Sequence, residues 1–491
     1  MSKTDLLAVL PEAALFVWVC ALLVADLFAK NRNLIHYGSL AGLLALTGLS
    51  VGFFDSGLAI TAFKGSFVSD PLAHLLKICA YLATAISLVL SRQYLHDRGL
   101  LKGEFYGLAL CALLGQMVMI SSANLLTVYL GLELMSLALY ALVALQRDSR
   151  SATESAMKYF VLGALASGFL LYGLSMLYGA TGSFDIHTIA TLITSGQANK
   201  PIVVFASVFI VAGLSFKFGV APFHMWVPDV YQGAPTAVTL LLAGAPKIAA
   251  LALMLRLLVQ GMGGIALDWQ PMLWTVAIAS LLIGNLTAIM QTNFKRMLAY
   301  STIAHMGFVM LGMSAGITGS SPANAVNAYS GALFYMLTYV ITTLGTFGMV
   351  LLLAGKDFEA DSINDLKGLS QRRPGLALLL LILMFSLSGI PPTVGFYAKL
   401  SVLQAVWAAD QAWLAVIGVL ASLIGAFYYL KVVKAMYFDA PPVVLGDSAV
   451  QAIGPRMLLL LTAGSVLLLG MLPGPLLNLC SATIKALLGG L

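Results

Sequence analysis

Three lysines lie in apolar stretches that are long enough to cross a membrane, each close to a proline. They are Lys217 in GLSFKFGVAPFHMW, Lys247 in LLLAGAPKIAALALML and Lys399 in LMFSLSGIPPTVGFYAKL. Placing one ionisable group at the centre of a bilayer costs about 2.5–3.5 kcal/mol on insertion scales. A lysine at this depth therefore differs from an ordinary lysine on a protein surface, which has no such cost. Because the proton affinity of a lysine responds to its surroundings, they are candidate proton carriers.

Glu133 is a carboxylate in the middle of another such stretch, LLTVYLGLELMSLALYAL. Acidic residues at this depth usually serve a function. A buried lysine is the simplest partner for it, and pairing would keep both groups charged in spite of desolvation. Weakening such a pair could move a proton, with the two groups titrating as a unit. The alternative is an ion pair that only packs two helices together.

A helix break is predicted just after Lys217. Pro222 lacks an N–H and clashes with the carbonyl four residues before it, so the Phe218 carbonyl should be free for water or a side chain. His224 follows the break, and its neutral imidazole can both donate and accept a hydrogen bond, which suits a relay. A core histidine bonded to a backbone carbonyl is the alternative.

Lys247 is the strongest candidate for a central relay, because no acidic residue lies within two turns of it along the sequence. Lys399 lies beyond Pro392 on a helix expected to run outward, which places it nearer the outer surface as an exit group. His305, in AYSTIAHMGFVML, could link the two halves of the chain. Three possible hydroxyl carriers precede it: Tyr300, Ser301 and Thr302.

The composition is that of a polytopic membrane protein. Of 491 residues, 60% are hydrophobic and 9% are charged, whereas about a quarter of a soluble domain is charged. The four cysteines are scattered without a C-x-x-C spacing, so no metal, haem or iron–sulfur site is predicted. The sequence lacks a basic patch interleaved with aromatic residues, so no nucleic-acid partner is predicted.

A membrane-spanning helix needs about 20 mostly apolar residues, and on that rule the chain holds fourteen. The first is expected to be retained rather than cleaved, since Glu12 interrupts it and no convincing cleavage site follows. The predicted spans are 5–29, 36–54, 71–91, 104–121, 124–145, 154–179, 201–231, 235–260, 271–291, 296–316, 324–354, 374–408, 411–438 and 456–480.

Loop charge predicts the orientation of these spans. Loops and helix ends after the odd-numbered spans hold 17 of the 26 Lys and Arg residues, and the opposite side holds four. Examples from the rich side are Lys30, Arg32, Arg147, Arg150, Lys295, Arg296, Arg372 and Arg373. Because positively charged loops stay in the cytoplasm, both termini are expected on the outer side.

Five further charged residues are interpreted as anchors at the membrane surface. Lys77 and Arg256 lie toward the outer ends of their spans, where long side chains can extend to water. Lys158, Lys295 and Arg296 lie near cytoplasmic ends. Lys158 and Lys295 could also take up protons there, although anchoring is the simpler interpretation.

A short internal repeat connects two of the lysine-bearing spans. Gly219-Val-Ala-Pro222 and Gly389-Ile-Pro-Pro392 share a Gly-x-x-Pro pattern, and both pairs differ by 170 (389 − 219 and 392 − 222). They lie in the seventh and twelfth spans, so the two helices run in opposite directions. This arrangement is typical of an inverted repeat whose broken helices meet near the membrane midplane.

Four segments together resemble the antiporter-like membrane subunits of proton-pumping NADH:quinone oxidoreductase, respiratory complex I. They are FKFGVAPFHMWVPDVYQGAPTAVT, AGAPKIAAL, FKRMLAYSTIAHMGF and SLSGIPPTVGFYAKL. The resemblance covers nearly the whole chain. It implies an all-α fold of about 14 transmembrane helices with two inverted five-helix repeats, in which helices 7 and 12 are broken.

The resemblance also implies a division of the chain and a set of roles. The divisions are 1–103 for helices 1–3, 104–262 and 263–440 for the repeats, and 441–491 for helix 14. The roles are a Glu133–Lys217 pair, a central Lys247 and Lys399 at the outer end of a half-channel. Redox energy would come from another arm of the complex, so NADH, flavin, iron–sulfur clusters and quinone would bind in other subunits and not in this chain.

We therefore expect a proton-translocating membrane subunit in a bacterial inner membrane, in contact with other membrane subunits, the lipid bilayer, protons and water. The residues expected to carry protons are Glu133, Lys217, Lys247 and Lys399, with His224 and His305 in secondary roles. A cation/proton antiporter subunit shares the same lysines, but Na⁺ needs oxygen ligands and mid-span carboxylates are scarce. A mainly structural subunit is the other alternative.

Overall fold

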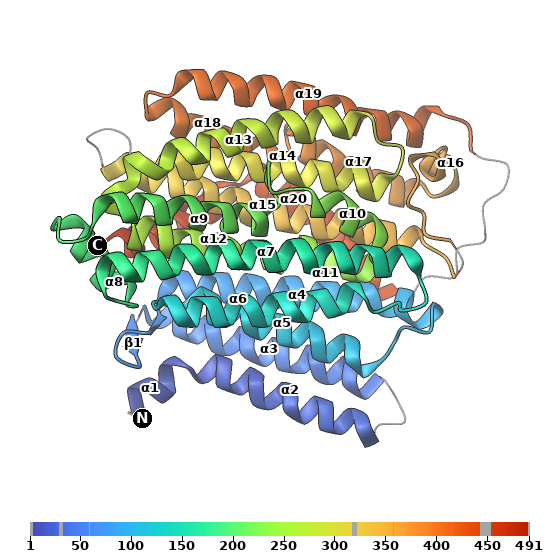
Figure 1. The fold of residues 1–491 in the computed structure, drawn as a ribbon. Coiled ribbons are helices and arrows are strands. Elements are labelled where there is room, and N and C mark those ends of the chain that lie inside the picture. Colours follow the sequence, from blue (N-terminus) through green and yellow to red (C-terminus); the bar gives the residue numbers. More distant parts are fainter. Residues whose placement is uncertain are drawn as a thin grey trace.

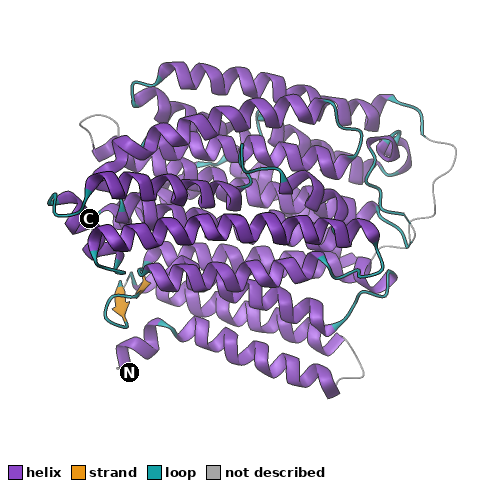
Figure 2. Ribbon diagram, in the orientation of Figure 1, coloured by secondary structure: helices purple, strands orange, loops and turns teal. Residues whose placement is uncertain are grey.

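The computed structural model describes residues 3–28, 33–57, 59–316, 322–356, 358–441 and 453–489. Lys30 and Arg32, two of the residues used to predict the orientation, lie outside these ranges. Within them the chain is almost entirely helical (Figure 2). The strands found there are β1 (Ile60–Ala62) and β2 (Phe67–Ser69), which form one antiparallel hairpin.

Long helices lie side by side across the molecule (Figure 1). Thirteen helical segments of the described residues are long and apolar enough to cross a membrane. They are α2 (Leu10–Phe28), α3 (Asn33–Ser56), α4 (Pro71–Asp97), α5 (Gly103–Ser121), α6 (Leu125–Val143), α7 (Arg150–Thr181), α9 (Lys200–Phe218), the run of α11 (Thr236–Ala243), α12 (Ala245–Met254) and η1 (Leu255–Gly261), α13 (Ala266–Ile289), α14 (Phe294–Ser314), α15 (Pro322–Leu353), α19 (Ala412–Phe438) and α20 (Ile453–Met471).

A fourteenth crossing is made of two shorter helices, α17 (Pro374–Ser388) and α18 (Val394–Ala408). The predicted number of crossings is therefore confirmed. An even number returns the chain to its starting side, and both termini lie at the left end of the helices in Figure 1. The remaining short elements are α1 (Lys3–Ala8), α8 (Ile186–Thr194), α10 (Trp226–Gly233), η2 (Gly263–Ile265), η3 (Ile363–Leu366) and α16 (Leu369–Arg372).

The last predicted span, 456–480, is wrong in its extent. Helix α20 ends at Met471, and a separate helix, α21 (Gly474–Leu488), follows. Pro473 precedes the new helix and Pro475 lies in its first turn. Proline cannot donate the backbone hydrogen bond that a continuing helix needs, so the two prolines separate the elements.

Two connectors show that the chain repeats its architecture in inverted form. Asn124 caps α6 and pairs with Asp185, which caps α8; Asn293 caps α14 and pairs with Ser362, which caps η3. Asn124 and Asn293 are 169 residues apart (293 − 124). Helix α8 lies at one end of the bundle, and α16, which follows η3, lies at the other (Figure 1).

Helix packing repeats with the same offset. A Cβ atom on Gly115 would lie 2.4 Å from the Met135 nitrogen, and one on Gly284 would lie 2.7 Å from the Ala304 nitrogen. The second pair follows the first by 169 residues (284 − 115 and 304 − 135). Both glycines allow two helix backbones to approach directly. The equal offsets agree with two inverted repeats in the chain.

Two charged residues predicted to reach the membrane surface are in fact buried. Lys77 is 0% exposed, and its Nζ lies 2.5 Å from Oε1 of Glu12 on α2. Arg256 is 2% exposed and pairs through both terminal nitrogens with Asp70, at 2.8 Å each. Their position along a helix could not reveal these partners, because Glu12 and Asp70 come from other parts of the chain.

Candidate functional site

The first predicted break is present between α9 and α10. Helix α9 ends at Phe218, and Gly219 follows in the left-handed region with φ of +71°. Glycine is the residue that adopts this conformation without steric cost. The chain then turns through Pro222 and resumes as α10 at Trp226. The end of α9 thus leaves backbone carbonyls in the middle of the bundle.

Lys247 occupies this break. Its Nζ donates hydrogen bonds to the carbonyls of Phe218, at 2.7 Å, and Lys217, at 3.2 Å, and its side chain is 1% exposed. The ring of Trp226 lies 5.3 Å away. The prediction that the Phe218 carbonyl is available to a side chain is confirmed. Carbonyl oxygens can accept from an ammonium group, so Lys247 is satisfied without a carboxylate.

Lys217 does not contact Glu133 directly. Its Nζ donates to Oγ of Ser136, at 2.8 Å, one turn along α6 from Glu133. Glu133 is half-buried, its Oε1 has no hydrogen-bond partner, and no ion pair within 4.0 Å joins it to a base in the described part of the chain. Ser136 thus stands where the direct pair was expected. Sequence reasoning missed it, although its position three residues after Glu133 was a usable signal.

The second break lies between α17 and α18. Helix α17 ends at Ser388, and Gly389 follows with φ of +84°. Lys399 donates from Nζ to the Ser388 carbonyl and to Oγ of Ser422, both at 2.8 Å, and is 8% exposed. Each break therefore has a buried lysine on the carbonyl that precedes a left-handed glycine.

His305 lies between two tyrosines. Its Nδ1 is 2.7 Å from the Tyr335 hydroxyl, and its Nε2 is 2.9 Å from the Tyr429 hydroxyl. The Tyr428 hydroxyl lies 3.1 Å from the Tyr429 hydroxyl and 3.1 Å from Oδ1 of Asn285. All of these groups can pass a proton or orient a water molecule. Ring hydroxyls distant in sequence were not foreseen as partners of His305.

The hydroxyls predicted beside His305 have different surroundings. Ser301 contacts the Tyr429 hydroxyl at 2.6 Å, which joins it to the same network. Thr302 accepts from Tyr339 at 2.8 Å. Tyr300 is half-buried, with the Arg296 guanidinium 5.9 Å from its ring centre. Ser301 is therefore the hydroxyl of the three that the structure joins to His305.

Two cavities of about 10 Å³ flank His305, each close to the space that one water molecule needs. One is lined by Lys399, Ser422 and Tyr428 as well as His305. The other lies toward Thr338, Thr342 and Ser386. A single water in the first cavity would connect Lys399 to the imidazole. The second half of the chain thus forms one polar cluster.

His224 lies apart from both clusters. It is on the turn between α9 and α10, it is half-buried, and its Nδ1 is enclosed without a hydrogen-bond partner. Its backbone carbonyl accepts from the Val227 N–H at 2.9 Å. The six predicted site residues therefore divide into the Lys217–Lys247 cluster with Glu133 nearby, the Lys399–His305 cluster, and His224 on the turn.

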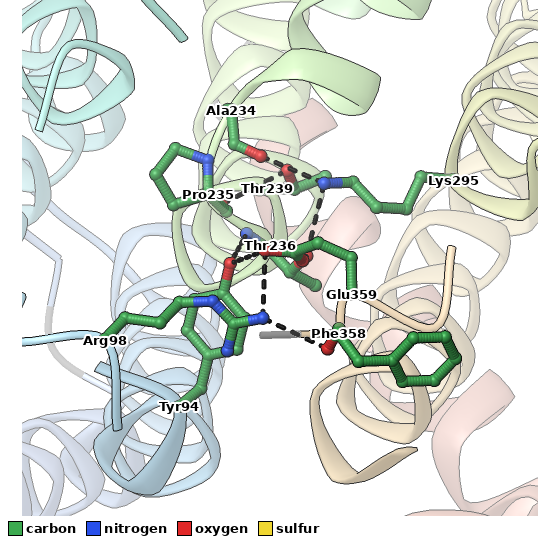
Figure 3. A network of polar contacts seen from close by, with 9 residues as sticks. All are labelled: Tyr94, Arg98, Ala234, Pro235, Thr236, Thr239, Lys295, Phe358 and Glu359. Carbon is green, nitrogen blue, oxygen red and sulfur yellow. Dashed lines mark hydrogen bonds and ion pairs between the residues drawn. The ribbon is translucent and has the colours of Figure 1, made fainter. Parts of the chain in front are cut away.

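Lys295 is buried and does not anchor the chain at the surface as predicted. It is 2% exposed, and its Nζ donates to the Ala234 carbonyl, at 3.0 Å, and to Oγ1 of Thr236, at 3.2 Å (Figure 3). Lys158 fits the prediction better, since it is 43% exposed and paired with Glu154 and Asp229. The sequence placed both lysines near helix ends, but only packing distinguishes them.

Glu359 extends the Lys295 network (Figure 3). Its Oε2 accepts from Thr236 at 3.0 Å, and its Oε1 accepts from Tyr94 at 2.8 Å and lies 3.1 Å from Arg98. Glu359 is 38% exposed, so the network reaches the surface at this end of the bundle. No sequence signal identified Glu359, because its loop position is unremarkable without the fold.

Comparison with known proteins identifies the family of the chain. Residues 122–425 match the family described as NADH:quinone oxidoreductase/Mrp antiporter, TM. The chain belongs to this family. A curated relative, NADH-quinone oxidoreductase subunit N of Herminiimonas arsenicoxydans, is 55% identical over 99% of both chains. A subunit N of Cupriavidus taiwanensis is 54% identical, again over 99% of both chains.

Solved structures of the family share the fold. A chain of respiratory complex I from Thermus thermophilus with bound aureothin is 31% identical, with a TM-score of 0.80 over 96% of this chain and 99% of that one. A chain of the Mrp complex from Dietzia has a TM-score of 0.84 over 99% and 98%, but at 21% identity it shows the fold alone. All six predicted site residues lie within the residues that match the family.

Proposed function

We propose that the chain is a proton-translocating membrane subunit of an NADH:quinone oxidoreductase, the counterpart of subunit N in its relatives. It would be a non-redox part of a translocase, with NADH, flavin, iron–sulfur clusters and quinone bound by other subunits. The observation that carries the proposal is the buried lysine at each helix break, Lys247 and Lys399, bonded to a backbone carbonyl. Such a lysine can change its charge without leaving a buried carboxylate unpaired.

The first half would control the proton on Lys247 through the charge of Lys217. The Lys247 ammonium bonds to the backbone carbonyl of Lys217. When Lys217 stays on Ser136 its charge opposes that of Lys247, and when it turns toward Glu133 the carboxylate compensates it. Movement of Lys217 between these partners would therefore alter the proton affinity of Lys247.

The second half would receive and release the proton. Lys399 shares a cavity with His305, and Ser422 and Tyr428 line the same space. A neutral imidazole can accept a proton on one nitrogen while the other donates to a tyrosine. In this proposal the proton is carried by Glu133, Lys217, Lys247 and Lys399. His305 is a secondary relay in the second half, and His224 binds water at the first break.

The charge distribution of the loops supports an orientation in which both termini face the periplasm of a bacterial inner membrane. The chain would divide into helices 1–3 over 1–103, two inverted repeats over 104–262 and 263–440, and a C-terminal segment over 441–491. Neighbouring membrane subunits, lipid, water and protons are its proposed partners.

Replacing Lys247 with Ala tests the proposal. The change removes the donor to two buried carbonyls. Each carbonyl left without a donor lowers the stability of the folded protein by about 1–3 kcal/mol. We expect the complex to assemble while NADH-driven proton uptake into reconstituted vesicles falls severely. Lys158→Ala is a matched control, since that lysine is half-exposed. Unchanged pumping by Lys247→Ala would favour a structural subunit, and Na⁺-dependent pumping would favour a cation antiporter.

A further inference from the structure

Helix α4 carries a buried polar stripe along its whole length, from its N-cap to its last turn. Successive members are three or four residues apart, so each lies one turn from the next, with Cβ atoms about 5–6 Å apart. Apart from the cap residue, 13% exposed, every member is at most 4% exposed. The α4 stripe consists of Asp70, His74, Lys77, Tyr81, Thr84, Ser87, Ser91 and Tyr94.

Several polar atoms along the α4 stripe are buried without a hydrogen bond. They include Nδ1 of His74, the Ser91 hydroxyl and Oε2 of Glu12. Tyr81 and Ser50 of α3 face one another, but neither hydroxyl makes a hydrogen bond of normal geometry. Buried polar groups are nearly always paired with protein or ordered water. Gathered along one helix face, these atoms are donors and acceptors that ordered water would satisfy.

The ion pair of Glu12 and Lys77 stands within the stripe. The two side chains are 4% and 0% exposed. An apolar pair of similar volume is often as stable as a buried ion pair, or more so, so helix packing alone does not explain these charges. Tyr81 is the next member of the stripe after Lys77. The side chains of Glu12 and Lys77 are therefore ionisable groups that can gain or lose a proton, and polar groups lie on both sides of them along the stripe.

Both ends of the stripe join polar clusters near the ends of the bundle. At one end Asp70 pairs with Arg256, and Ser69 lies 2.8 Å from Nε2 of His74. At the other end Tyr94 donates to Glu359, which is part of the Lys295 network in Figure 3. Polar groups thus continue from the surface carboxylate Glu359 across the bundle to the end where the termini lie.

We propose that the α4 stripe is a second, hydrated proton path, gated by the Glu12–Lys77 ion pair. It is separate from the lysines at the helix breaks, and α4 itself lies before the residues 122–425 that match the family. The proposal rests on the proposed function, because the redox reaction of the complex must drive the transfer. At rest the Lys77 ammonium opposes the passage of a free cation through the stripe.

The transfer balances as a cycle of three steps. A proton from the Glu359 end converts the Glu12 carboxylate to a carboxylic acid and breaks the ion pair. Lys77 then releases its own proton to Nδ1 of neutral His74, which has no hydrogen-bond partner, and the proton leaves toward Asp70. The Lys77 amine finally takes the proton of the Glu12 acid, and the ion pair is restored. One proton has crossed, and no other group has changed.

The test is proton transport by the reconstituted complex with Tyr81→Phe. The Tyr81 hydroxyl makes no hydrogen bond of normal geometry, so its removal should leave assembly and thermal stability unchanged. We expect the number of protons moved per NADH to fall. Tyr329→Phe is the matched control, because its hydroxyl on α15 is likewise buried and unpartnered but lies off the α4 stripe. A wild-type ratio for Tyr81→Phe would overturn the proposal.

A double variant distinguishes transport from a structural clamp. Glu12→Met with Lys77→Met replaces the ion pair by apolar side chains of similar length. A clamp predicts normal assembly and pumping, whereas a proton path predicts normal assembly with a lowered proton-to-NADH ratio. If Lys247→Ala pumps normally while these variants do not, the path through the lysines at the helix breaks fails and the α4 stripe stands. The reverse result removes the stripe alone.

Discussion

The two halves of the bundle interrupt corresponding helices at Gly219 and at Gly389, and each break holds a lysine, but the lysines come from different places. Lys247 belongs to α12, the next crossing in the chain, whereas Lys399 belongs to α18, the second part of the broken helix itself. The backbone geometry has therefore been kept while the source of the ammonium group has changed. The feature that both sites share is a lysine whose ammonium bonds to the last carbonyl of the first part of a broken helix.

The halves also differ in the polar groups that surround the lysine. Ser136 on α6 and His305 on α14 are 169 residues apart (305 − 136), the same offset that relates the packing glycines. Ser136 binds the ammonium of Lys217, whereas His305 lies between the neutral hydroxyls of Tyr335 and Tyr429. The first half is thus suited to control by charge, and the second to proton exchange through neutral groups.

Gly219→Ala should have the largest effect of three changes that probe this comparison. Both glycines have positive φ, which costs an alanine about 1–2 kcal/mol. At Gly219 the new Cβ would also lie 2.4 Å from Val227, whereas at Gly389 it would meet the flexible side chain of Lys399 at 2.9 Å. We expect Gly219→Ala to reduce assembled complex and pumping more than Gly389→Ala, measured on native gels and in vesicles.

The control for the glycine pair is Gly168→Ala on α7, where a Cβ has open space within 4 Å. This change should leave assembly intact, since alanine favours a helix over glycine. Equal losses for Gly219→Ala and Gly389→Ala would show that the two breaks are equally tolerant, and the proposed difference between them would be wrong.

His305→Phe should have an intermediate effect. It leaves the Tyr335 hydroxyl without its imidazole partner, at about 1–3 kcal/mol for the unsatisfied group, whereas the Tyr429 hydroxyl keeps its contacts with Ser301 and Tyr428. Ser136→Ala removes the bond from Lys217 and the bond that Ser136 donates to the Leu132 carbonyl of its own helix, and it frees Lys217 to approach Glu133. We expect the histidine variant to lower the rate of proton pumping per assembled complex more than the serine variant does. The opposite order would place the sensitive exchange step in the first half.

Asp70→Asn should have the smallest effect of the three on assembly, and its stability effect should depend on pH. Burial alone would raise the pKa of Asp70, but the Arg256 guanidinium and the Ala73 N–H hold this pKa below its ordinary value of 3.8. The ionised carboxylate therefore stabilises the folded protein at any pH above that ordinary pKa. This stabilisation is lost as the pH falls through the lowered pKa. The thermal midpoint of the wild-type complex should exceed that of the variant at neutral pH.

This difference should be constant from about pH 8 to pH 5 and narrow below about pH 4. Asp410→Asn, at an exposed position in the second half, is the control and should show no such difference. A wild-type advantage that grows on acidification would contradict the assigned sign. The result tests whether the end of the first repeat, and not that of the second, depends on an ion pair to α4.

The helix breaks could be predicted from sequence because their causes are local. Pro222 and Pro392 each follow a glycine by three residues, and a proline disrupts the turn before it wherever it stands. The availability of the Phe218 carbonyl followed from the same rule. Membrane crossings were equally accessible, since a run of apolar residues needs no information about its neighbours.

The partners of the charged residues could not be predicted, because they depend on which helices touch. Lys77 is satisfied by Glu12, more than 60 residues earlier, and Lys295 by carbonyl and hydroxyl groups of the segment before α12. The sequence gives the depth of each lysine but not the surface that covers it. Ser136 illustrates the same limit, since a serine in a helix usually bonds only to its own backbone.

The opposed directions of α9 and α17 have an electrical consequence. The C-terminal end of a helix carries a partial negative charge of about half an electron. Lys247 lies at the C-terminal end of α9 and Lys399 at that of α17, so each ammonium is attracted by a helix dipole. Because the two helices enter the membrane from opposite sides, a transmembrane voltage stabilises one dipole as much as it destabilises the other. When the membrane potential changes, the electrostatic energies of the two dipoles therefore change by opposite amounts. Their sum stays nearly constant, so the backbone that supports the two ammonium groups is little affected.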